Sequence, residues 1–204
     1  MRARDLMSAP VETVHPWTAA KEAAEILSEH GFTALPVVDD DDRLIGIVTE
    51  ADLIRGRIPA DTRSEYRHPY HPGAIETTVG AVMTSPATAM SSGTDVADLC
   101  QALVDAQIRA MPIVDGSRLV GIVTRGDVVR VLAREDHAIA SDVRHRLEIY
   151  GGTGRWKVEV HDGIVRIVDL YDDETDRHVA TLLALAVPGV VGADTVSAEQ
   201  EVGR

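Results

Sequence analysis

Apolar runs of strand length alternate with helical patterns over residues 1–136, and the whole series occurs twice. The first copy has apolar runs at 35–38 and 44–48, and the second has them at 111–114 and 119–123. Continuous apolar runs of this length are typical of strands that are covered on both faces. In each copy one helical pattern precedes the strands and another follows them. The sequence therefore predicts a duplicated α/β unit.

The residues at the ends of these elements repeat as well. A Met-x-x-Pro segment opens each copy, at Met7 and again at Met83. Thr18 and Thr94 stand where the first helix of each copy begins. They are interpreted as N-caps, because a threonine hydroxyl can accept a hydrogen bond from a backbone N–H of the first turn. Gly31 is expected to end the first of these helices.

Each copy closes with a strand, a turn and a helix that together carry a hydroxyl and a carboxylate. Residues 46–52 are Gly-Ile-Val-Thr-Glu-Ala-Asp, and residues 121–127 are Gly-Ile-Val-Thr-Arg-Gly-Asp. Both polar side chains stand where a strand stops, so both can point toward a ligand above the strand end. The alternative is that they only cap the following helix. The pairs are Thr49 with Asp52 and Thr124 with Asp127.

After residue 137 the pattern becomes that of a separate small unit. A helical pattern over 139–149 is followed by two alternating strands with Asp162-Gly163 between them, which is a strong hairpin signal. A second helix and a third strand follow, with Pro188-Gly189 between them. The order predicted is α-β-β-α-β. The strands are expected at 157–160, 164–170 and 190–197, and the second helix at 176–186.

Charge narrows the possible partners. The chain of 204 residues has a net charge of −13. This argues against a nucleic-acid partner and against docking on anionic lipid by charge alone, because both depend on clustered Lys and Arg. A phosphate ligand is not excluded, since a pocket needs only local positive charge. Arg144, Arg146, Arg155 and Lys157 are interpreted as a solvated edge or, alternatively, as a small basic patch.

Cysteine usage and the lack of targeting signals lead us to expect a cytoplasmic protein. Cys100 has no second cysteine to pair with, and it is interpreted as a small buried side chain rather than a redox switch. The N-terminus has no signal-peptide pattern, and the longest apolar run, 182–193, is too short to span a membrane. His68 and His71 are interpreted as part of an exposed linker, so no metal site is expected.

With these motifs on both copies, the first part of the chain resembles a tandem pair of CBS domains, or Bateman module. The last part resembles a BON domain, through the alternating strand 158–165 and the segment 187–190. The resemblance implies an α/β (α+β) fold with two β-α-β-β-α repeats in pseudo-twofold symmetry and a small α-β-β-α-β domain. The repeats are placed at 1–58 and 78–136, the linker at 59–77 and the BON-like domain at 137–204.

The CBS resemblance also implies clefts between the repeats that bind an adenosyl ligand such as AMP, ADP, ATP or S-adenosylmethionine, with no cofactor required. Asp127 and Thr124 would hold the ribose hydroxyls and nearby phosphate oxygens in one cleft. Asp52 and Thr49 would do so in the other. The other repeat would line each adenine slot: Thr18, Ala23, Phe32 and Thr33 for the Asp127 cleft, and Thr94, Leu99 and Ile108 for the Asp52 cleft.

Two substitutions between the copies predict that the clefts differ. Arg109 stands where the first copy has Thr33, and Arg125 stands where it has Glu50. An arginine can bind phosphate oxygens with two donors, whereas a glutamate repels them. We therefore expect the Asp127 cleft to take a phosphorylated nucleotide, and the Asp52 cleft to be empty or to take a less anionic ligand.

The resulting hypothesis is a regulatory sensor rather than an enzyme. An adenine nucleotide would change the packing of the repeats, and the BON-like domain would pass the change to an unidentified protein or membrane partner. Bateman modules commonly pair, so a homodimer is expected. The sequence has no Ser-His-Asp order, phosphate-binding glycine loop or Cys-His cluster that would favour catalysis. The alternatives are a scaffold with vestigial clefts and a nucleotide hydrolase.

Overall fold

The computed structural model describes residues 1–55, 77–171 and 173–199. The expected linker at 59–77, with His68 and His71, lies outside these ranges except for Thr77. The chain divides into an N-terminal unit, residues 2–125, and a C-terminal unit, residues 126–204 together with Met1. The division falls before Gly126, so most of the helix that follows the second 121–127 motif belongs to the C-terminal unit. Each unit is described by itself below.

The first repeat is a helix, a two-stranded antiparallel sheet and a short second helix. These are α1 (Ala20–His30), β1 (Ala34–Val38), β2 (Leu44–Thr49) and α2 (Glu50–Ile54). Every residue of β1 is buried, as its continuous apolar run predicts. Gly31 ends α1 in the left-handed conformation, with φ of 66°, as expected. The apolar face of α1 packs on this sheet and forms a core with Leu35, Val37 and Val48.

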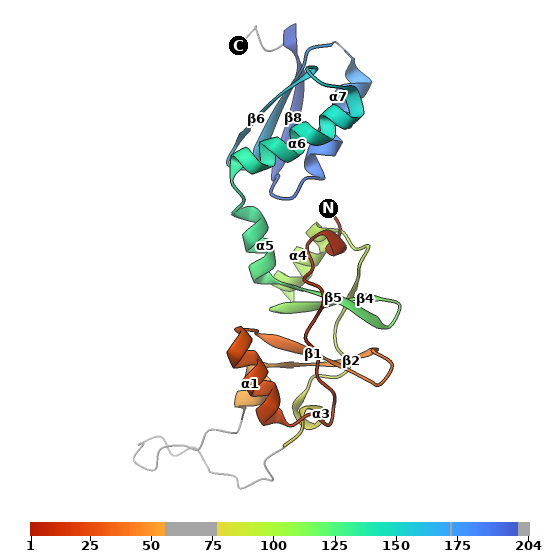
Figure 1. The fold of residues 1–204 in the computed structure, drawn as a ribbon, viewed down its shortest axis with the longest axis vertical. Helices are drawn as coiled ribbons and strands as arrows, with labels where there is room; N and C mark the ends of the chain where they lie inside the picture. The colour runs from red at the N-terminus through yellow and green to blue at the C-terminus, as the bar shows by residue number, and fades with distance from the viewer. Residues whose placement is uncertain (56–76, 172, 200–204) are drawn as a thin grey trace, which may run out of the picture. The chain divides into compact units, whose positions relative to one another are not determined.

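The second repeat has the same helix-strand-strand order, preceded by a short helix and a short strand. Its elements are α3 (Val79–Val82), β3 (Met90–Ser91), α4 (Val96–Asp105), β4 (Ala110–Asp115) and β5 (Arg118–Thr124). The sheet order is β3-β4-β5, with β4 and β5 antiparallel. Figure 1 shows both repeats stacked within the N-terminal unit.

The predicted N-caps of the first helices are wrong by one residue. Helix α1 begins after Ala19, and the hydroxyl of Thr18 instead accepts a hydrogen bond from the backbone N–H of His15. Helix α4 begins after Asp95, whose carboxylate accepts from the N–H of Ala97 at 2.9 Å. Aspartate is as good an N-cap as threonine, and the Thr-Asp sequence offered both choices.

The opening segment of each repeat pairs with the last strand of the other repeat. Ser8 exchanges two backbone hydrogen bonds with Ile122 on β5, and Thr84 does the same with Ile47 on β2. The preceding methionines, Met7 and Met83, pack against Gly121 on β5 and Gly46 on β2. A Cβ added to Gly46 would lie 2.7 Å from Met83 Sδ, and a Cβ added to Gly121 would meet the side chain of Met7.

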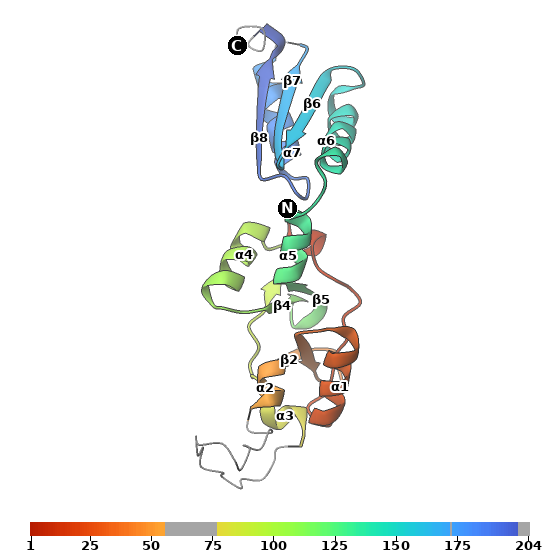
Figure 2. The same ribbon diagram turned by 90° about the vertical axis from the view of Figure 1, so that its left-hand side faces the viewer.

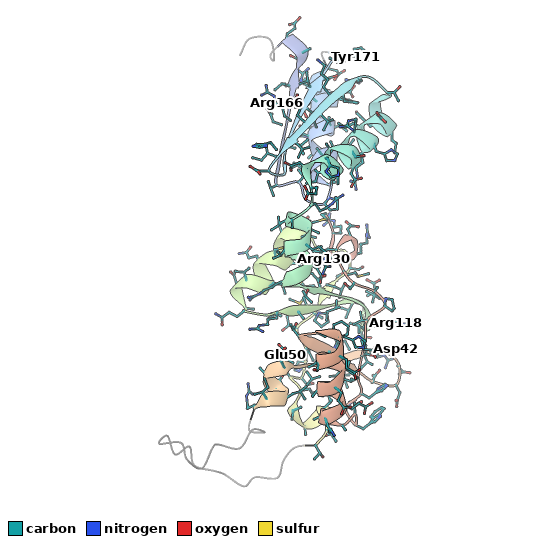
Figure 3. All side chains as sticks on the ribbon, turned by 60° about the vertical axis from the view of Figure 1, so that its left-hand side comes forward. Asp42, Glu50, Arg118, Arg130, Arg166 and Tyr171 are labelled. Atoms are coloured by element: carbon teal, nitrogen blue, oxygen red, sulfur yellow. The ribbon has the colours of Figure 1, made fainter. Side chains whose placement is uncertain are left out.

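The turns between the paired strands also meet across the repeats. The N–H of Leu44 donates to Ser117 O, and the N–H of Leu119 donates to Asp42 O. Figure 3 shows Asp42 and Arg118 side by side, where Arg118 Nη2 lies 3.5 Å from Asp42 Oδ2. These contacts repeat with exchanged roles, so the two repeats are related by the expected pseudo-twofold symmetry.

The C-terminal unit places two helices on one face of a three-stranded sheet (Figure 2). It contains most of α5 (Arg125–Leu132), followed by α6 (Asp136–Gly151), β6 (Trp156–His161), β7 (Ile164–Asp169), α7 (Glu174–Leu185) and β8 (Gly192–Ser197). Strands β6 and β7 are antiparallel, and β7 and β8 are parallel. The predicted α-β-β-α-β order is confirmed from α6 onward. Helices α6 and α7 bury Ile139, Val143 and Ala180 against the sheet.

The predicted hairpin at Asp162-Gly163 forms, and both residues have positive φ, of 50° and 74°. The carboxylate of Asp136, in the first turn of α6, accepts hydrogen bonds from both of their backbone N–H groups at 2.9 Å. This hairpin therefore has a fixed position relative to α6. None of the helices in the described ranges is both long and apolar enough to cross a membrane.

Candidate functional site

A pocket of about 510 Å³ lies within the N-terminal unit and is lined by both repeats. The first repeat supplies the turn before β1 and the junction of β2 with α2. The second repeat supplies Thr84, Thr88 and the residues just before β4. Its volume is in the range of cavities that hold nucleotide-sized ligands.

The lining combines apolar walls with a few polar groups, as small-molecule sites generally do. The apolar residues are Ala34, Ile47, Ala51, Ile54, Ile108 and Ala110. The hydroxyl and amide groups come from Thr33, Thr49, Thr84, Thr88 and Gln107. Among the lining residues that the structure describes, Glu50 and Arg109 are the charged ones. Such a lining can hold a flat apolar ring system and a polyhydroxylated group together.

Glu50 and Arg109 form an ion pair across the repeats, with Arg109 Nη1 3.6 Å from Glu50 Oε2. Their side chains are 48% and 72% exposed. The Glu50 N–H donates to Thr33 O, and in the second repeat the Arg125 N–H donates to Arg109 O. The sequence alignment of Thr33 with Arg109, and of Glu50 with Arg125, is thus confirmed by equivalent backbone hydrogen bonds.

The hydroxyl of Thr49 is part of a reciprocal cap at the start of α2. It donates to Asp52 Oδ2 at 2.7 Å, and the Thr49 N–H donates to the same oxygen at 3.0 Å. The Asp52 N–H donates back to Thr49 Oγ1 at 3.4 Å. Thr49 lines the pocket, but Asp52 is not among its lining residues. Asp52 therefore caps α2, which is the role that the alternative interpretation assigned to it.

Arg109 and Arg125 were expected to bind phosphate oxygens in the Asp127 cleft, and the structure shows other contacts for both side chains. Arg125 donates from Nε to Ile108 O at 3.0 Å and from Nη2 to Leu103 O at 2.7 Å. Its guanidinium thus supports the chain between α4 and β4. Arg109, which was assigned to the Asp127 cleft, lies instead in the pocket beside Glu50 and Thr49.

Ile108 was predicted for the Asp52 cleft and lines the pocket, and Thr33 also lines it although it was assigned to the Asp127 cleft. Ala23 and Leu99 are fully buried. Phe32 is partly exposed and stacks on His30 with a centroid distance of 5.1 Å. Thr94, which was assigned to the Asp52 cleft, is not among the residues that line this pocket. Thr18, Ala23 and Phe32 were assigned to the Asp127 cleft, so this pocket does not test them.

Sequence reasoning missed Thr84, Thr88 and Gln107, as well as Ile47 and Ile54. One signal was available for Thr84, because it lies in the duplicated Met-x-x-Pro segment at the position equivalent to Ser8. That segment was interpreted only as a marker of the repeat. Thr88 and Gln107 stand in connecting segments without a repeated motif, so no pattern pointed to them.

Asp127 lies in the first turn of α5 and belongs to the C-terminal unit. It is 6% exposed, and its Oδ1 accepts a hydrogen bond from Arg130 Nη1 at 2.9 Å. Thr124 belongs to the N-terminal unit. The Asp127 cleft would combine residues of both units, and it therefore stays a prediction.

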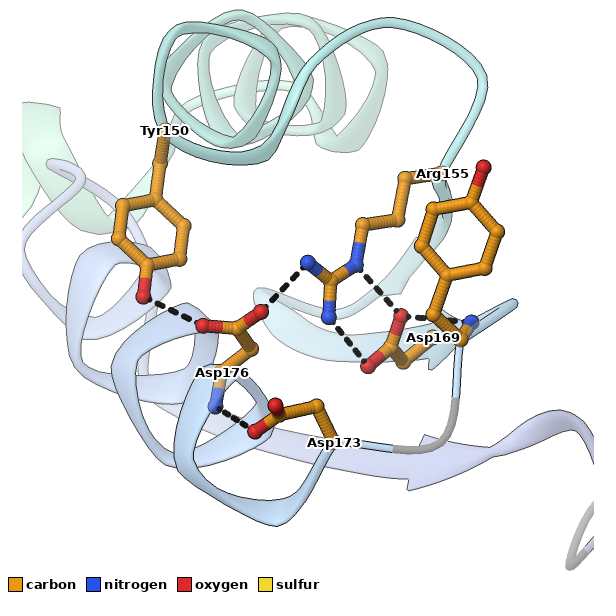
Figure 4. Close-up of polar contacts among 6 residues, drawn as sticks. Tyr150, Arg155, Asp169, Asp173 and Asp176 are labelled. Carbon is orange, nitrogen blue, oxygen red and sulfur yellow. Dashed lines mark hydrogen bonds and ion pairs between the residues drawn. The ribbon is translucent and has the colours of Figure 1, made fainter.

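A second polar cluster lies inside the C-terminal unit, where Arg155 binds two carboxylates (Figure 4). Its Nε and Nη2 donate to the two oxygens of Asp169 at 2.8 and 2.9 Å. Its Nη1 donates to Asp176 Oδ2, and the Tyr150 hydroxyl donates to Asp176 Oδ1 at 2.7 Å. The Arg155 side chain is 10% exposed. It is therefore not part of a basic patch or solvated edge, and that prediction is wrong for this residue.

The pKa values of these groups are shifted in the direction expected for ion pairs. Burial acts to raise the pKa of Asp169, but hydrogen bonds from Arg155 and the Tyr171 N–H bring it below its ordinary value. Hydrogen bonds from Tyr150 and Arg155 lower the pKa of Asp176. Both carboxylates therefore stay ionised at neutral pH. All three charges are paired, so we interpret the cluster as structural.

No group of three or more potential metal-ligating side chains occurs in the described ranges.

Comparison with known protein families and curated proteins identifies CBS domains in this chain. The CBS domain model matches residues 3–58 and 79–134. Hypoxic response protein 1 of Mycobacterium tuberculosis is 30% identical over 142 residues, which cover 70% of this chain and 91% of that protein.

Solved structures that are similar to this chain are also CBS domain pairs. The chain is similar to CBSX2 of Arabidopsis thaliana in complex with AMP, with 28% identity and a TM-score of 0.53 over 63% of this chain and 93% of that one. It is also similar to the CBS domain pair of MJ0100 in complex with 5′-methylthioadenosine and S-adenosyl-L-methionine. The identity is 27% and the TM-score 0.53, over 64% of this chain and 94% of that one. The ranges matched by the family model nearly coincide with the two interlocked repeats, and the chain therefore belongs to the CBS domain family.

Proposed function

We propose that this chain is a regulatory protein that binds an adenosyl ligand in the pocket between its CBS repeats and catalyses no reaction. The pocket carries the proposal, because it joins residues of both repeats and combines aliphatic walls with hydroxyls and one ion pair. Similar CBS pairs have been solved with AMP and with 5′-methylthioadenosine and S-adenosyl-L-methionine. A ligand in this position can favour one packing of the repeats over another.

We further propose that the C-terminal unit, with its likeness to BON domains, passes this response to a protein or membrane partner. The position of helix α5 in the sequence, directly after β5, supports this transmission of the response. Its first turn holds Asp127. Two residues after its end, Arg134 Nη1 donates to Pro188 O at 2.6 Å and Nη2 donates to Asp142 Oδ2 at 2.7 Å. A Cβ added to Gly189 would lie 3.2 Å from Val131 O, so α5 also packs closely on this loop.

We also propose a homodimer that pairs through the CBS repeats. Ile54 on α2 and Val104 on α4 are large apolar side chains that stand mostly exposed within the N-terminal unit. Contact with a second copy would remove such side chains from water. Analytical ultracentrifugation of the full chain tests this part of the proposal, and a monomer at micromolar concentration would exclude it.

Ligand binding is tested by isothermal titration with AMP, ADP, ATP, NAD and S-adenosylmethionine. The informative variant is Ala51→Trp, since Ala51 lines the pocket on the exposed side of α2 and a large ring there fills the space. Ala24→Trp is the matched control, because Ala24 is exposed on α1 outside the pocket. We expect saturable binding by the natural sequence and by the control, and none by Ala51→Trp.

The capping role of Asp52 favours a second candidate, a scaffold whose clefts bind nothing. It predicts no heat with any adenosyl ligand and no shift of the melting temperature. In that case Asp52→Ala would cost only a lost helix cap, about 0.5–2 kcal/mol.

A hydrolase would release phosphate or adenine from ATP. If the purified chain has this activity and Ala51→Trp does not, the result would support a hydrolase and contradict the proposal.

A further inference from the structure

In the part of the lining that the structure describes, one negative and one positive side chain form an ion pair between the two repeats. Glu50 begins α2 in the first repeat, and Arg109 precedes β4 in the second. Their contact is a single N–O approach of 3.6 Å, and both side chains are partly exposed. A loose pair of this kind contributes little to stability, so an entering ligand can compete for either member.

A phosphate group in this pocket would meet both charges. To bind Arg109, it must approach a guanidinium that already lies beside the Glu50 carboxylate. Like charges a few ångströms apart repel, and the repulsion grows with each added phosphate charge. A neutral 5′ group meets no such opposition, and a cationic group is attracted to Glu50.

Of the described residues that line the pocket, Arg109 is the only charged side chain that the second repeat supplies. At the position equivalent to Glu50 it has Arg125, whose guanidinium donates to the carbonyl oxygens of Leu103 and Ile108. Arg125 is not among the residues that line the pocket. Glu50 and Arg109 therefore determine the local charge that the described lining presents to a ligand.

We infer that Glu50 is a specificity-determining residue that selects against phosphate. The pocket takes an adenosine whose 5′ substituent is neutral or cationic, such as a thioether or a sulfonium, in preference to AMP or ATP. Glu50 lies beside Arg109, so a phosphate group binds Arg109 more tightly when that carboxylate is removed. The inference rests on the proposed function, because it assumes an adenosyl ligand in this pocket.

The test uses isoleucine methyl NMR on the full chain, since Ile47, Ile54 and Ile108 line the pocket and report binding at this site. Titrations with 5′-methylthioadenosine, AMP and ATP are compared for the natural sequence and Glu50→Gln. Glu29→Gln is the control, because it removes the same charge from an exposed position on α1 outside the pocket. The double variant Glu50→Gln/Arg109→Gln tests the role of the arginine.

In Glu50→Gln we expect AMP to bind about tenfold more tightly, equivalent to ~1.4 kcal/mol. The affinity for 5′-methylthioadenosine should change less than about threefold, because its 5′ group has no charge to repel. Glu29→Gln should leave both affinities unchanged. The double variant should lose the gain for AMP.

Two results would overturn the inference and leave the proposed function intact. One is 5′-methylthioadenosine binding with no gain for AMP in Glu50→Gln, and the other is an equal gain in Glu29→Gln. A gain that persists in the double variant excludes Arg109 as the phosphate ligand. If none of the probes shifts the three isoleucine methyl signals in any variant, the proposed function itself is overturned.

Discussion

Arg155 and Asp169 form a buried bidentate ion pair that joins the start of β6 to the end of β7. The pair is extended by Asp176 at the start of α7 and by Tyr150 at the end of α6 (Figure 4). Segments at β6, β7 and α7 therefore meet at one guanidinium, and α6 joins them through the hydrogen bond from Tyr150 to Asp176. The stacking of Arg155 on Trp156, 4.4 Å from the ring centroid, fixes its plane.

Removing the arginine should strongly destabilise the C-terminal unit. Arg155→Met leaves the carboxylate of Asp169 buried and unpaired, which costs about 3–5 kcal/mol. Urea unfolding followed by Trp156 fluorescence in a Trp17→Phe background measures the loss in this unit. Arg144→Met is the control, since Arg144 is exposed on α6, and it should change the midpoint little. An equal shift of the urea midpoint by the two substitutions would contradict the stabilising role of the Arg155 ion pairs.

The same cluster predicts lower stability in acid. The pKa values of Asp169 and Asp176 are lowered in the folded chain, so near pH 4 the unfolded chain binds more protons than the folded one. The stabilisation is fully present above the ordinary carboxyl pKa of 3.8 and is lost as pH falls through the lower folded values. Urea midpoints at pH 7, 5, 4 and 3 should fall most below pH 4, and less steeply in Asp169→Asn.

The close approach of Met7 to Gly121 predicts that a methyl group is not tolerated there. Gly121→Ala should destabilise the N-terminal unit by about 1–3 kcal/mol through overpacking. The double variant Met7→Ala/Gly121→Ala should recover part of the loss in thermal unfolding. Gly93→Ala is the control, because the nearest atom to a Cβ there is Ser91 Oγ at 3.8 Å. Full stability of Gly121→Ala would show that the segment around Met7 does not lie on β5.

The cysteine should react slowly. Burial raises the pKa of Cys100 on α4, and the thiol rather than the thiolate predominates at neutral pH. We expect alkylation by iodoacetamide at pH 7.5 to be slower than that of a cysteine in an unstructured peptide, and to reach the peptide rate in urea. Fast alkylation of Cys100 in the folded chain would support the alternative interpretation of this residue as a redox switch.

The duplication made most of the fold predictable. The apolar runs of β1 and β4 and the turn at Asp162-Gly163 are local signals, and each corresponds to the observed element. The pairing of Ser8 with Ile122 was not predictable, because it joins distant segments that have no apolar alternation of their own. The buried charge of Asp169 gave no signal either, since its partner Arg155 looked like part of an exposed basic group.

The candidate site was predicted less well than the fold. Thr49 and Ile108 were assigned to one cleft from family resemblance and line the pocket, whereas Thr33, which also lines it, was assigned to the Asp127 cleft. Ala23 was assigned to the Asp127 cleft and is buried on α1. That assignment stays a prediction, because a sequence match does not fix which face of a helix meets a cleft. The position of Arg109 depends on how the repeats interlock, which residue patterns within a single repeat do not contain.

The reciprocal pairing of Ser8 with β5 and of Thr84 with β2 bears on the origin of this chain. Each opening segment completes the sheet of the other repeat, so one repeat by itself leaves a strand edge without its neighbour. A single-repeat ancestor would complete that edge by exchanging opening segments with a second copy, as a symmetric domain-swapped dimer does. Duplication of such a repeat within one chain would keep this exchange and would allow equivalent positions, such as Thr33 and Arg109, to carry different side chains.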